Sequence, residues 1–315
     1  GDQDRAKRYA CDAAAEARAK LAFDRAAQFY EIAIGLEKDE TVKPSLLRAL
    51  GDCQASHGHV TRAAEAYQRA AAALDEPMQS WDLRHLAAEQ LLRGGHVIQG
   101  LDLLHGVLKQ EGLHLARSPR TALFSLTWRL AWRHLRGFKF RDKPSAEISP
   151  ANKHRLDVLW SVTHGLGVVD TVRANDFLLR FIALALKLGD ARRVAQGMAV
   201  LGAQMAALGG SRFTWAMRLV SEAEVLARCS GHPAVIGLAR MCRAFVGYFS
   251  GEFDAMASEF MAIEKHFLSK CHGVSWDLAT TRSFACFSLR LSGRLRELCE
   301  RVDRYCADAD RTGDR

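Results

Sequence analysis

Apolar residues recur along the first third of the chain at a fixed spacing. A small residue is followed four positions later by an aromatic residue or leucine, and three positions after that by alanine or valine. The pattern occurs three times, in steps of 37 residues, at Ala26-Tyr30-Ala33, Ala63-Tyr67-Ala70 and Gly100-Leu104-Val107. Positions four and three apart lie on one face of a helix, so each copy predicts an amphipathic helix.

A second helix is expected before each of these. Gly51 lies seven residues before Gly58, and Ala88 lies seven residues before Gly95. Small residues at facing positions let two helices approach closely, and the later glycine of each pair permits a tight turn. The repeating unit is therefore predicted to be a helix hairpin. Long stretches rich in Ala, Leu, Arg and Glu, with only six prolines, also favour an all-helical chain.

The best copy of this unit resembles the tetratricopeptide repeat. The stretch LLRALGDCQASHGHVTRAAEAYQRAAAALDEP, residues 46–77, carries that family's apolar residue, Leu-Gly pair, turn glycine, alanine, tyrosine, alanine and late proline, in order. The family's usual period is about 34 residues, so each copy here has about three additional loop residues. Weaker copies predict further hairpins over 152–188, with a break near 169–170, and over 190–228, with a turn at Gly209-Gly210.

The resemblance implies an all-α fold, a right-handed superhelical array of about seven helix hairpins with one irregular basic helical insertion. We expect three hairpins over 1–112, the basic Trp/Arg-rich helix and loop over 113–150, and about four degenerate hairpins over 151–315. Since the chain ends where another first helix would start, we also expect it to be part of a longer protein.

The net charge of the chain is concentrated in the insertion. Residues 117–155 hold ten basic and two acidic side chains, a net charge of +8. The whole chain, with 44 basic and 36 acidic residues, also carries +8. A helix is predicted over 120–136, in which a narrow basic ridge lies opposite a wider apolar arc. The ridge comprises Arg129, Arg133 and Arg136, and the arc includes Phe124, Trp128, Trp132 and Leu135.

Because the apolar arc is the wider one, we expect it to pack against neighbouring hairpins and to leave the basic ridge exposed. The ridge would then be solvated or paired with acids elsewhere in the chain, which we favour. It could instead contact an acidic protein or a neighbouring domain, or bind nucleic acid or anionic lipid. A membrane-surface helix usually has a broader charged face, and the aromatic residues lie on the wrong side to stack on bases. The first observation argues against a membrane surface, and the second argues against single-stranded nucleic acid.

The sequence contains no P-loop, GxGxxG, GxSxG, HExxH or kinase motif. Two groups of residues have the chemistry of metal ligands, Cys53 with His57 and His59, and His266 with Cys271 and His272. Simple clusters at helix ends are the favoured interpretation of both groups. We therefore expect no enzyme, no cofactor and no metal. The eight cysteines are scattered without a CxxC pair, and the first ten residues lack the apolar segment of a signal peptide. We therefore expect free thiols and a cytoplasmic protein.

A helix-hairpin array of the resembled kind binds its partner through the first helix of each hairpin, which lines the concave side. The candidate binding residues on these helices are Arg8, Arg18, Arg48, Asp52, Asp82, His85, Glu89 and Arg93. The expected partner is a protein segment or a neighbouring domain of the same polypeptide. Arg48 and Asp52 are also spaced to form an ion pair with each other.

A narrower resemblance covers residues 81–210 and, more weakly, the rest. The stretches HLAAEQLLRGGHVIQGLDLLHGVL, RLDVLWSVTHGLGVVDTVRANDF and AVLGAQMAALGG are similar to the C-terminal region of large bacterial proteins that join a Ser/Thr kinase domain to a signalling ATPase. This resemblance implies a non-catalytic protein-, peptide- or effector-binding scaffold, the sensor or regulatory arm of such a signalling protein. The alternative is a nucleic-acid- or anionic-membrane-binding module that uses residues 117–155.

Overall fold

The structure is a computed structural model that describes residues 2–20, 22–74, 77–110, 112–116, 118–167, 170–210, 212–271 and 274–312. Within these ranges the chain forms fifteen α-helices, one short 3₁₀ helix and no strand, which confirms the predicted all-helical class. The chain divides into two compact units. Residues 1–117, 164–171 and 305–315 form the first unit, and residues 118–163 and 172–304 form the second.

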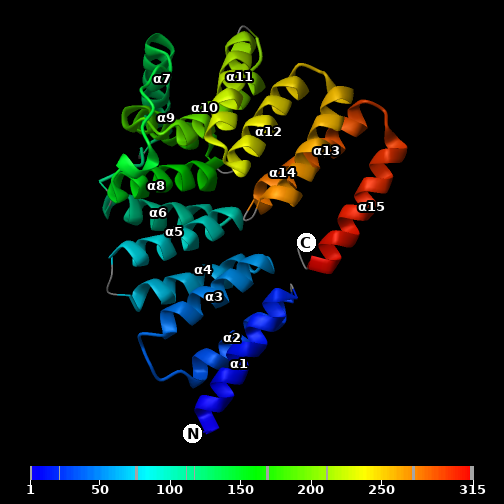
Figure 1. Cartoon of the computed structure of the whole chain (residues 1–315). Helices are drawn as coiled ribbons and strands as arrows, with labels where there is room; N and C mark the ends of the chain where they lie inside the picture. Colours follow the sequence, from blue (N-terminus) through cyan, green and yellow to red (C-terminus); the bar gives the residue numbers. More distant parts are fainter. Residues whose placement is uncertain are drawn as a thin grey trace. The chain divides into compact units, whose positions relative to one another are not determined.

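In the first unit, successive helices pack against one another from α1 to α6 (Figure 1). Their bounds are α1 Asp2–Ala19, α2 Phe23–Leu36, α3 Lys43–Ser56, α4 Val60–Ala72, α5 Pro77–Arg93 and α6 Val97–Gln110. Gly58 and Gly95 lie in the turns that join α3 to α4 and α5 to α6, with φ of 84° and 79°. Side chains with a Cβ rarely adopt this conformation, so the two glycines serve the turns as predicted.

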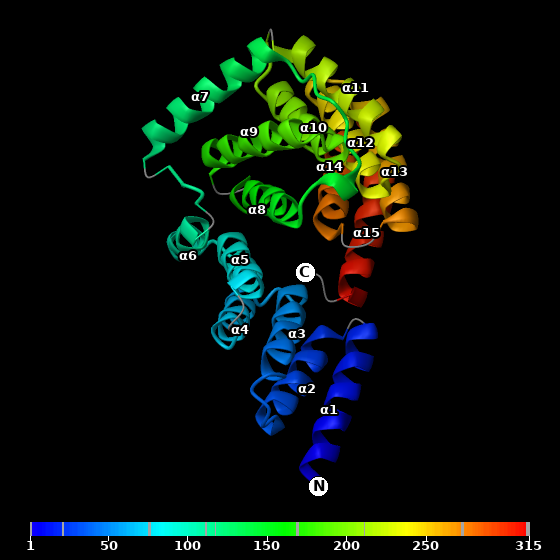
Figure 2. The same ribbon diagram turned by 60° about the vertical axis from the view of Figure 1, so that its left-hand side comes forward.

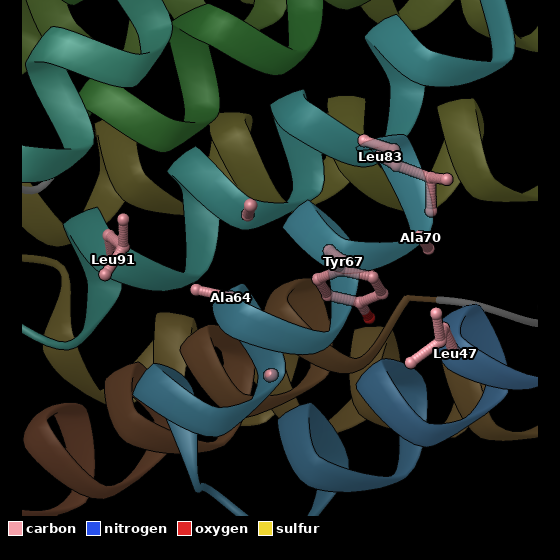
Figure 3. Packing of buried hydrophobic residues seen from close by; sticks show 9 residues of the cluster. Leu47, Ala64, Tyr67, Ala70, Leu83 and Leu91 are labelled. Atoms are coloured by element: carbon pink, nitrogen blue, oxygen red, sulfur yellow. The ribbon is translucent and has the colours of Figure 1, made fainter. Parts of the chain in front are cut away.

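The core of the first unit is built from the repeated positions. Ala63, Tyr67 and Ala70 of α4 are buried against Leu47 of α3 and Leu83 of α5, so three successive helices contribute to one cluster (Figure 3). The equivalent positions Ala26, Tyr30 and Ala33 of α2 and Gly100 and Leu104 of α6 are buried as well. The spacing in the sequence therefore identified which face of each second helix enters the core.

The close approach of paired helices depends on Gly51. A Cβ atom at this position would lie 2.5 Å from Cε1 of the Tyr67 ring, a distance that non-bonded carbon atoms do not tolerate. The phenol ring therefore occupies the space that a side chain at position 51 would fill. This arrangement is the predicted one, in which a small residue on the first helix accommodates a large residue on the second.

The remaining helices lie mostly in the second unit, although residues 164–167, 171 and 305–312, at the ends of three of them, belong to the first. Their bounds are α7 Pro119–Arg136, the 3₁₀ helix Ser145–Glu147, α8 Pro150–Gly167, α9 Thr171–Leu188, α10 Ala191–Ala207, α11 Arg212–Ser230, α12 Pro233–Phe249, α13 Phe253–Lys270, α14 Ser275–Leu291 and α15 Leu295–Thr312. From α10 to α14 each helix packs against the next one along the chain. The bounds of α8 to α11 agree with the helices predicted over 152–188 and 190–228.

Large apolar side chains fill the interior of the second unit. Phe177, Phe181, Phe260 and Phe267 are almost completely buried.

In the described part of the chain, no helix is long and apolar enough to cross a membrane.

Candidate functional site

The basic helix predicted over 120–136 is α7, and local capping explains where it begins and ends. The Ser118 hydroxyl accepts a hydrogen bond from the Thr121 backbone N–H, and the Thr121 hydroxyl oxygen accepts one from the Ser118 backbone N–H. Pro119, in the first turn, has no N–H group to leave unpaired. Gly137 ends the helix with a φ of 65°.

One side of α7 is attached to α9 through a buried carboxylate. Asp176 of α9 has a side chain only 2% exposed. Its Oδ1 atom accepts hydrogen bonds from the Ser125 hydroxyl at 2.6 Å and from Arg129 Nε at 3.0 Å. Its Oδ2 atom pairs with Arg180 Nη2 at 2.5 Å. Burial lowers the pKa of the Arg180 guanidinium, although Asp176 opposes that shift. The carboxylate therefore joins two helices through three donors.

The C-terminal end of α7 has a second set of contacts in the same unit. The His134 ring packs edge-on against Trp215 of α11, with 5.3 Å between ring centroids. Arg133 Nη1 donates a hydrogen bond to the Gly137 carbonyl at 3.0 Å, and its guanidinium lies 5.7 Å from the centre of the Phe138 ring. Burial lowers the pKa of Arg133, and the neighbouring Arg136 adds to this shift. Two arginines of the predicted ridge thus point inward.

The expected orientation of this helix is therefore wrong. The apolar arc predicted to pack against neighbouring hairpins is exposed, while Arg129 and Arg133 are half-buried and only Arg136 is exposed. The exposed fractions on the apolar side are 53% for Leu123, 73% for Phe124, 64% for Trp128, 46% for Trp132 and 80% for Leu135. We call Phe124, Trp128, Trp132 and Leu135 the aromatic stripe.

The orientation follows from the cost of burying an unpaired charge. Asp176 is a buried residue of α9, and a buried carboxylate requires hydrogen-bond donors. Ser125 and Arg129 of α7 supply two of them, so this side of α7 faces α9. A signal was present in the sequence, because Asp176 is the only acidic residue within the apolar helix 171–188. The width of the apolar arc of α7 could not by itself reveal which side of this helix faces α9.

The aromatic stripe has internal order and borders a hollow. The rings of Trp128 and Trp132 are stacked, with centroids 6.4 Å apart and planes inclined by 15°. The Arg136 guanidinium lies 4.6 Å from the centre of the Trp132 ring, a cation–π contact. A hollow of about 270 Å³ separates this part of α7 from α9 and is lined by Trp128, Arg129, Trp132, Arg133, Leu179 and Ala183.

The binding residues predicted on the first helices of the first unit occupy three kinds of environment. Arg8, Arg18, Arg48 and Asp82 are exposed, Asp52 and Glu89 are half-buried, and His85 is buried. The side chain of Arg93 lies outside the described residues. The exposed members remain candidates for binding a partner.

His85 is not a surface residue, contrary to the prediction. It is 6% exposed, and its ring stacks on that of Trp81 at 5.2 Å between centroids, with the planes 3° apart. Neither ring nitrogen has a hydrogen-bond partner among the described residues. Burial lowers the pKa of the imidazole from 6.5 to about 4, so His85 is neutral at pH 7. It belongs to the core because one turn separates it from the buried Trp81 and the two rings pack as a pair.

Asp52 has a different partner from the predicted one. Its Oδ1 atom accepts a hydrogen bond from the Tyr67 hydroxyl at 2.8 Å. No ion pair joins Asp52 to Arg48 in the part of the chain that the structure describes. Burial is the main cause that raises the pKa of Tyr67, and the Asp52 carboxylate adds to it. Asp52 thus joins α3 to α4 through Tyr67, and the Arg48 side chain is exposed to solvent.

The two groups with metal-ligand chemistry have other roles in the structure. His59 Nδ1 is hydrogen-bonded to Gln54 Oε1 at 2.9 Å, and the His57 and His59 rings are in edge contact at 4.5 Å. Cys53 is buried, and burial raises the pKa of its thiol to about 11. His266 Nε2 is hydrogen-bonded to the Pro233 carbonyl at 2.8 Å. His272 lies outside the described residues.

No model of a known protein family matches this chain, and no curated protein sequence matches it. Two surfaces therefore remain as candidates on their own geometry. One is the set of exposed arginines on the first helices of the first unit, and the other is the aromatic stripe of α7 in the second unit.

Proposed function

We propose that this chain is a non-catalytic binding module, a tetratricopeptide-like superhelical array of about seven hairpins that holds a protein segment or an effector. The observation that carries the proposal is the combination of a repeated rigid core with exposed charged side chains on the first helices. Tyr30 and Tyr67 are buried at equivalent positions, while Arg18 and Arg48 are exposed on α1 and α3. A surface of this kind presents fixed charges from a stable support, which is what selective binding of an extended peptide needs.

A peptide-array experiment with the full chain tests this proposal. We expect the chain to select short peptides with acidic residues and to retain them when the salt concentration is raised from about 0.15 M to about 0.5 M, because apolar contacts add to the charged ones. Arg18→Glu and Arg48→Glu should weaken the selected peptide about tenfold each. Arg62→Glu and Arg69→Glu, exposed charges on the second helix α4, are the matched controls and should have no effect.

Two results would contradict the proposal. Selection of no peptide by a folded chain would remove the reason to regard the first helices as a binding surface. Equal losses from the α4 controls would show that the arginines act through overall charge and not through a defined surface.

We further propose that this module is the regulatory arm of a larger signalling protein that contains a Ser/Thr kinase domain and an ATPase. The support is the resemblance over 81–210, and the step from that resemblance to a function is an analogy. The reading frame around the coding sequence is the direct test. A kinase glycine-rich loop with its catalytic-loop motif, or a P-loop, upstream of Gly1 is the expected result. A frame that codes only for residues 1–315 would refute the proposal.

A further inference from the structure

The aromatic stripe of α7 is exposed because the neighbouring side of the helix is held in place. Ser125 and Arg129 are both bonded to the buried Asp176 carboxylate, and His134 packs on Trp215. These contacts determine the rotation of α7 about its own axis. Large apolar side chains on a helix without such contacts would turn toward the protein interior to escape water. Their exposure is thus a consequence of specific polar contacts.

The stripe is long and narrow. Phe124, Trp128, Trp132 and Leu135 follow one another at steps of four, four and three residues, so they lie along one line on the helix surface. At about 1.5 Å per residue the line is about 16 Å long. Figure 2 shows α7 at the periphery of the second unit, alongside α9.

The charge around the stripe is of one sign. No acidic residue occurs from Gly112 to Arg141. Arg120 is exposed in the first turn of α7, and Arg136, Lys139 and Arg141 are exposed at and beyond its last turn. Cations therefore lie at both ends of the stripe, and Arg136 lies directly on the Trp132 ring.

This charge distribution separates the possible occupants. A second copy of the chain would bring two acid-free helices together, and the repulsion between their arginines would oppose that contact. Nucleic acid would need arginines free to reach phosphates, whereas Arg129 is engaged by Asp176 and Arg133 by the Gly137 carbonyl. A bilayer with anionic headgroups satisfies the stripe and its flanking cations at the same time, because its surface is flat, negative and apolar just below the headgroups.

We propose that α7 is an interfacial helix that lies on an anionic phospholipid bilayer. Phe124, Trp128, Trp132 and Leu135 enter the boundary between headgroups and acyl chains, where tryptophan is favoured. The cations at the two ends of the stripe contact lipid phosphates. The sequence-based expectation was that the apolar arc is buried, and its exposure is the observation that makes a membrane contact available. The proposal does not depend on the proposed function.

Vesicle sedimentation with the full chain is the main test. The probes are vesicles of phosphatidylcholine alone and vesicles containing about 30 mol% phosphatidylglycerol. We expect binding to the anionic vesicles, weak binding to the neutral ones, and a loss of binding at high salt. Trp128→Ser combined with Trp132→Ser should weaken binding at least about tenfold, since both apolar contacts are removed. Val225→Ser combined with Leu268→Ser, two exposed apolar residues on α11 and α13, is the matched control and should bind normally.

A second pair of variants tests the cations. Arg136→Glu combined with Lys139→Glu should also weaken binding to anionic vesicles about tenfold, because two attractions become repulsions. Lys265→Glu combined with Lys270→Glu, an equal change of charge at exposed positions of α13, should not. Far-ultraviolet circular dichroism of every variant confirms that it is folded.

Tryptophan quenching by brominated phospholipids gives a measurement on the unaltered chain. We expect quenching on anionic vesicles, and its absence would overturn the proposal. Failure of the folded chain to sediment with anionic vesicles, or equal binding by the stripe variant and its control, would overturn it as well. Tryptophan-dependent binding to soluble polyglutamate, without binding to vesicles, would also overturn it and would identify an acidic protein as the occupant.

Discussion

His85 should make the first unit sensitive to acid, and replacing it should remove that sensitivity. The imidazole is 6% exposed and stacked on Trp81, and within the described residues its ring nitrogens have no hydrogen-bond partner. A positive charge there would have neither water nor an acceptor to stabilise it. His85→Phe preserves the stacked ring and removes the proton-binding site.

The size of the effect follows from the pKa change. Burial lowers the pKa of His85 from 6.5 to about 4, so the unfolded chain binds the proton more tightly than the folded chain. The free energy of unfolding is therefore unaffected by this group above pH 6.5 and falls as the pH decreases from 6.5 toward 4. A change of one pKa unit corresponds to about 1.4 kcal/mol, which gives a loss of about 3 kcal/mol at pH 4.

Urea denaturation of the wild type and of His85→Phe at pH 7 and at pH 4 measures this loss. Other carboxyl groups titrate in the same range, so the quantity of interest is the difference between the two proteins at the two pH values. Hydrogen exchange in peptides from α5 assigns the effect to the first unit. We expect the wild type to lose about 3 kcal/mol more than the variant. The same pH dependence in both proteins would mean that His85 is solvated or paired, and the reasoning would be refuted.

Three further predictions concern packing and buried charge. Gly51→Leu should lower the free energy of unfolding by about 1–3 kcal/mol in urea titration, because a Cβ there would lie 2.5 Å from the Tyr67 ring, and a neutral result would disprove this packing. Asp176→Asn should cost about 3–5 kcal/mol and increase hydrogen exchange in α7, whereas Asp254→Asn, which alters an exposed ion pair, should cost at most about 1 kcal/mol. Burial raises the pKa of the half-buried Asp277 from 3.8 to about 6, so this group destabilises the fold above pH 6 and ceases to do so as the pH falls toward 4. Asp277→Asn should therefore stabilise the chain by about 1–2 kcal/mol relative to the wild type at pH 7. At pH 4 the two proteins should differ little, and urea titration at both pH values measures the difference.

The repeated core was predictable because its determinants are local. Ala63, Tyr67 and Ala70 lie on one face of a single helix, and the facing Gly51 and the turn at Gly58 are within a few turns in the sequence. Helical periodicity determines which of these side chains share a face, and steric size determines how close the helices come. Both properties can be read from the residues without knowledge of distant contacts.

The candidate surfaces were predicted only in part. Arg18 and Arg48 are exposed as expected, since charged side chains on the polar face of an amphipathic helix remain in water. His85 was assigned to the same surface, but stacking on Trp81 placed it in the core. A histidine fits either environment, because its neutral ring tolerates burial at a moderate cost. The choice depends on its neighbours.

By itself, the sequence determined that this chain is all-helical, about where α7 to α11 begin and end, and which residues of α2, α4 and α6 enter the core. These properties depend on interactions within a few turns of the chain. Only the tertiary structure decided that Arg129 and Arg133 of α7 are half-buried and that its aromatic stripe is exposed. The reason is the carboxylate of Asp176, 47 residues beyond Arg129, which required donors once α9 had buried it. A wide apolar arc favours burial of that side of the helix. The free-energy cost of one unpaired buried charge is larger, however, than the cost of exposing several apolar rings to water.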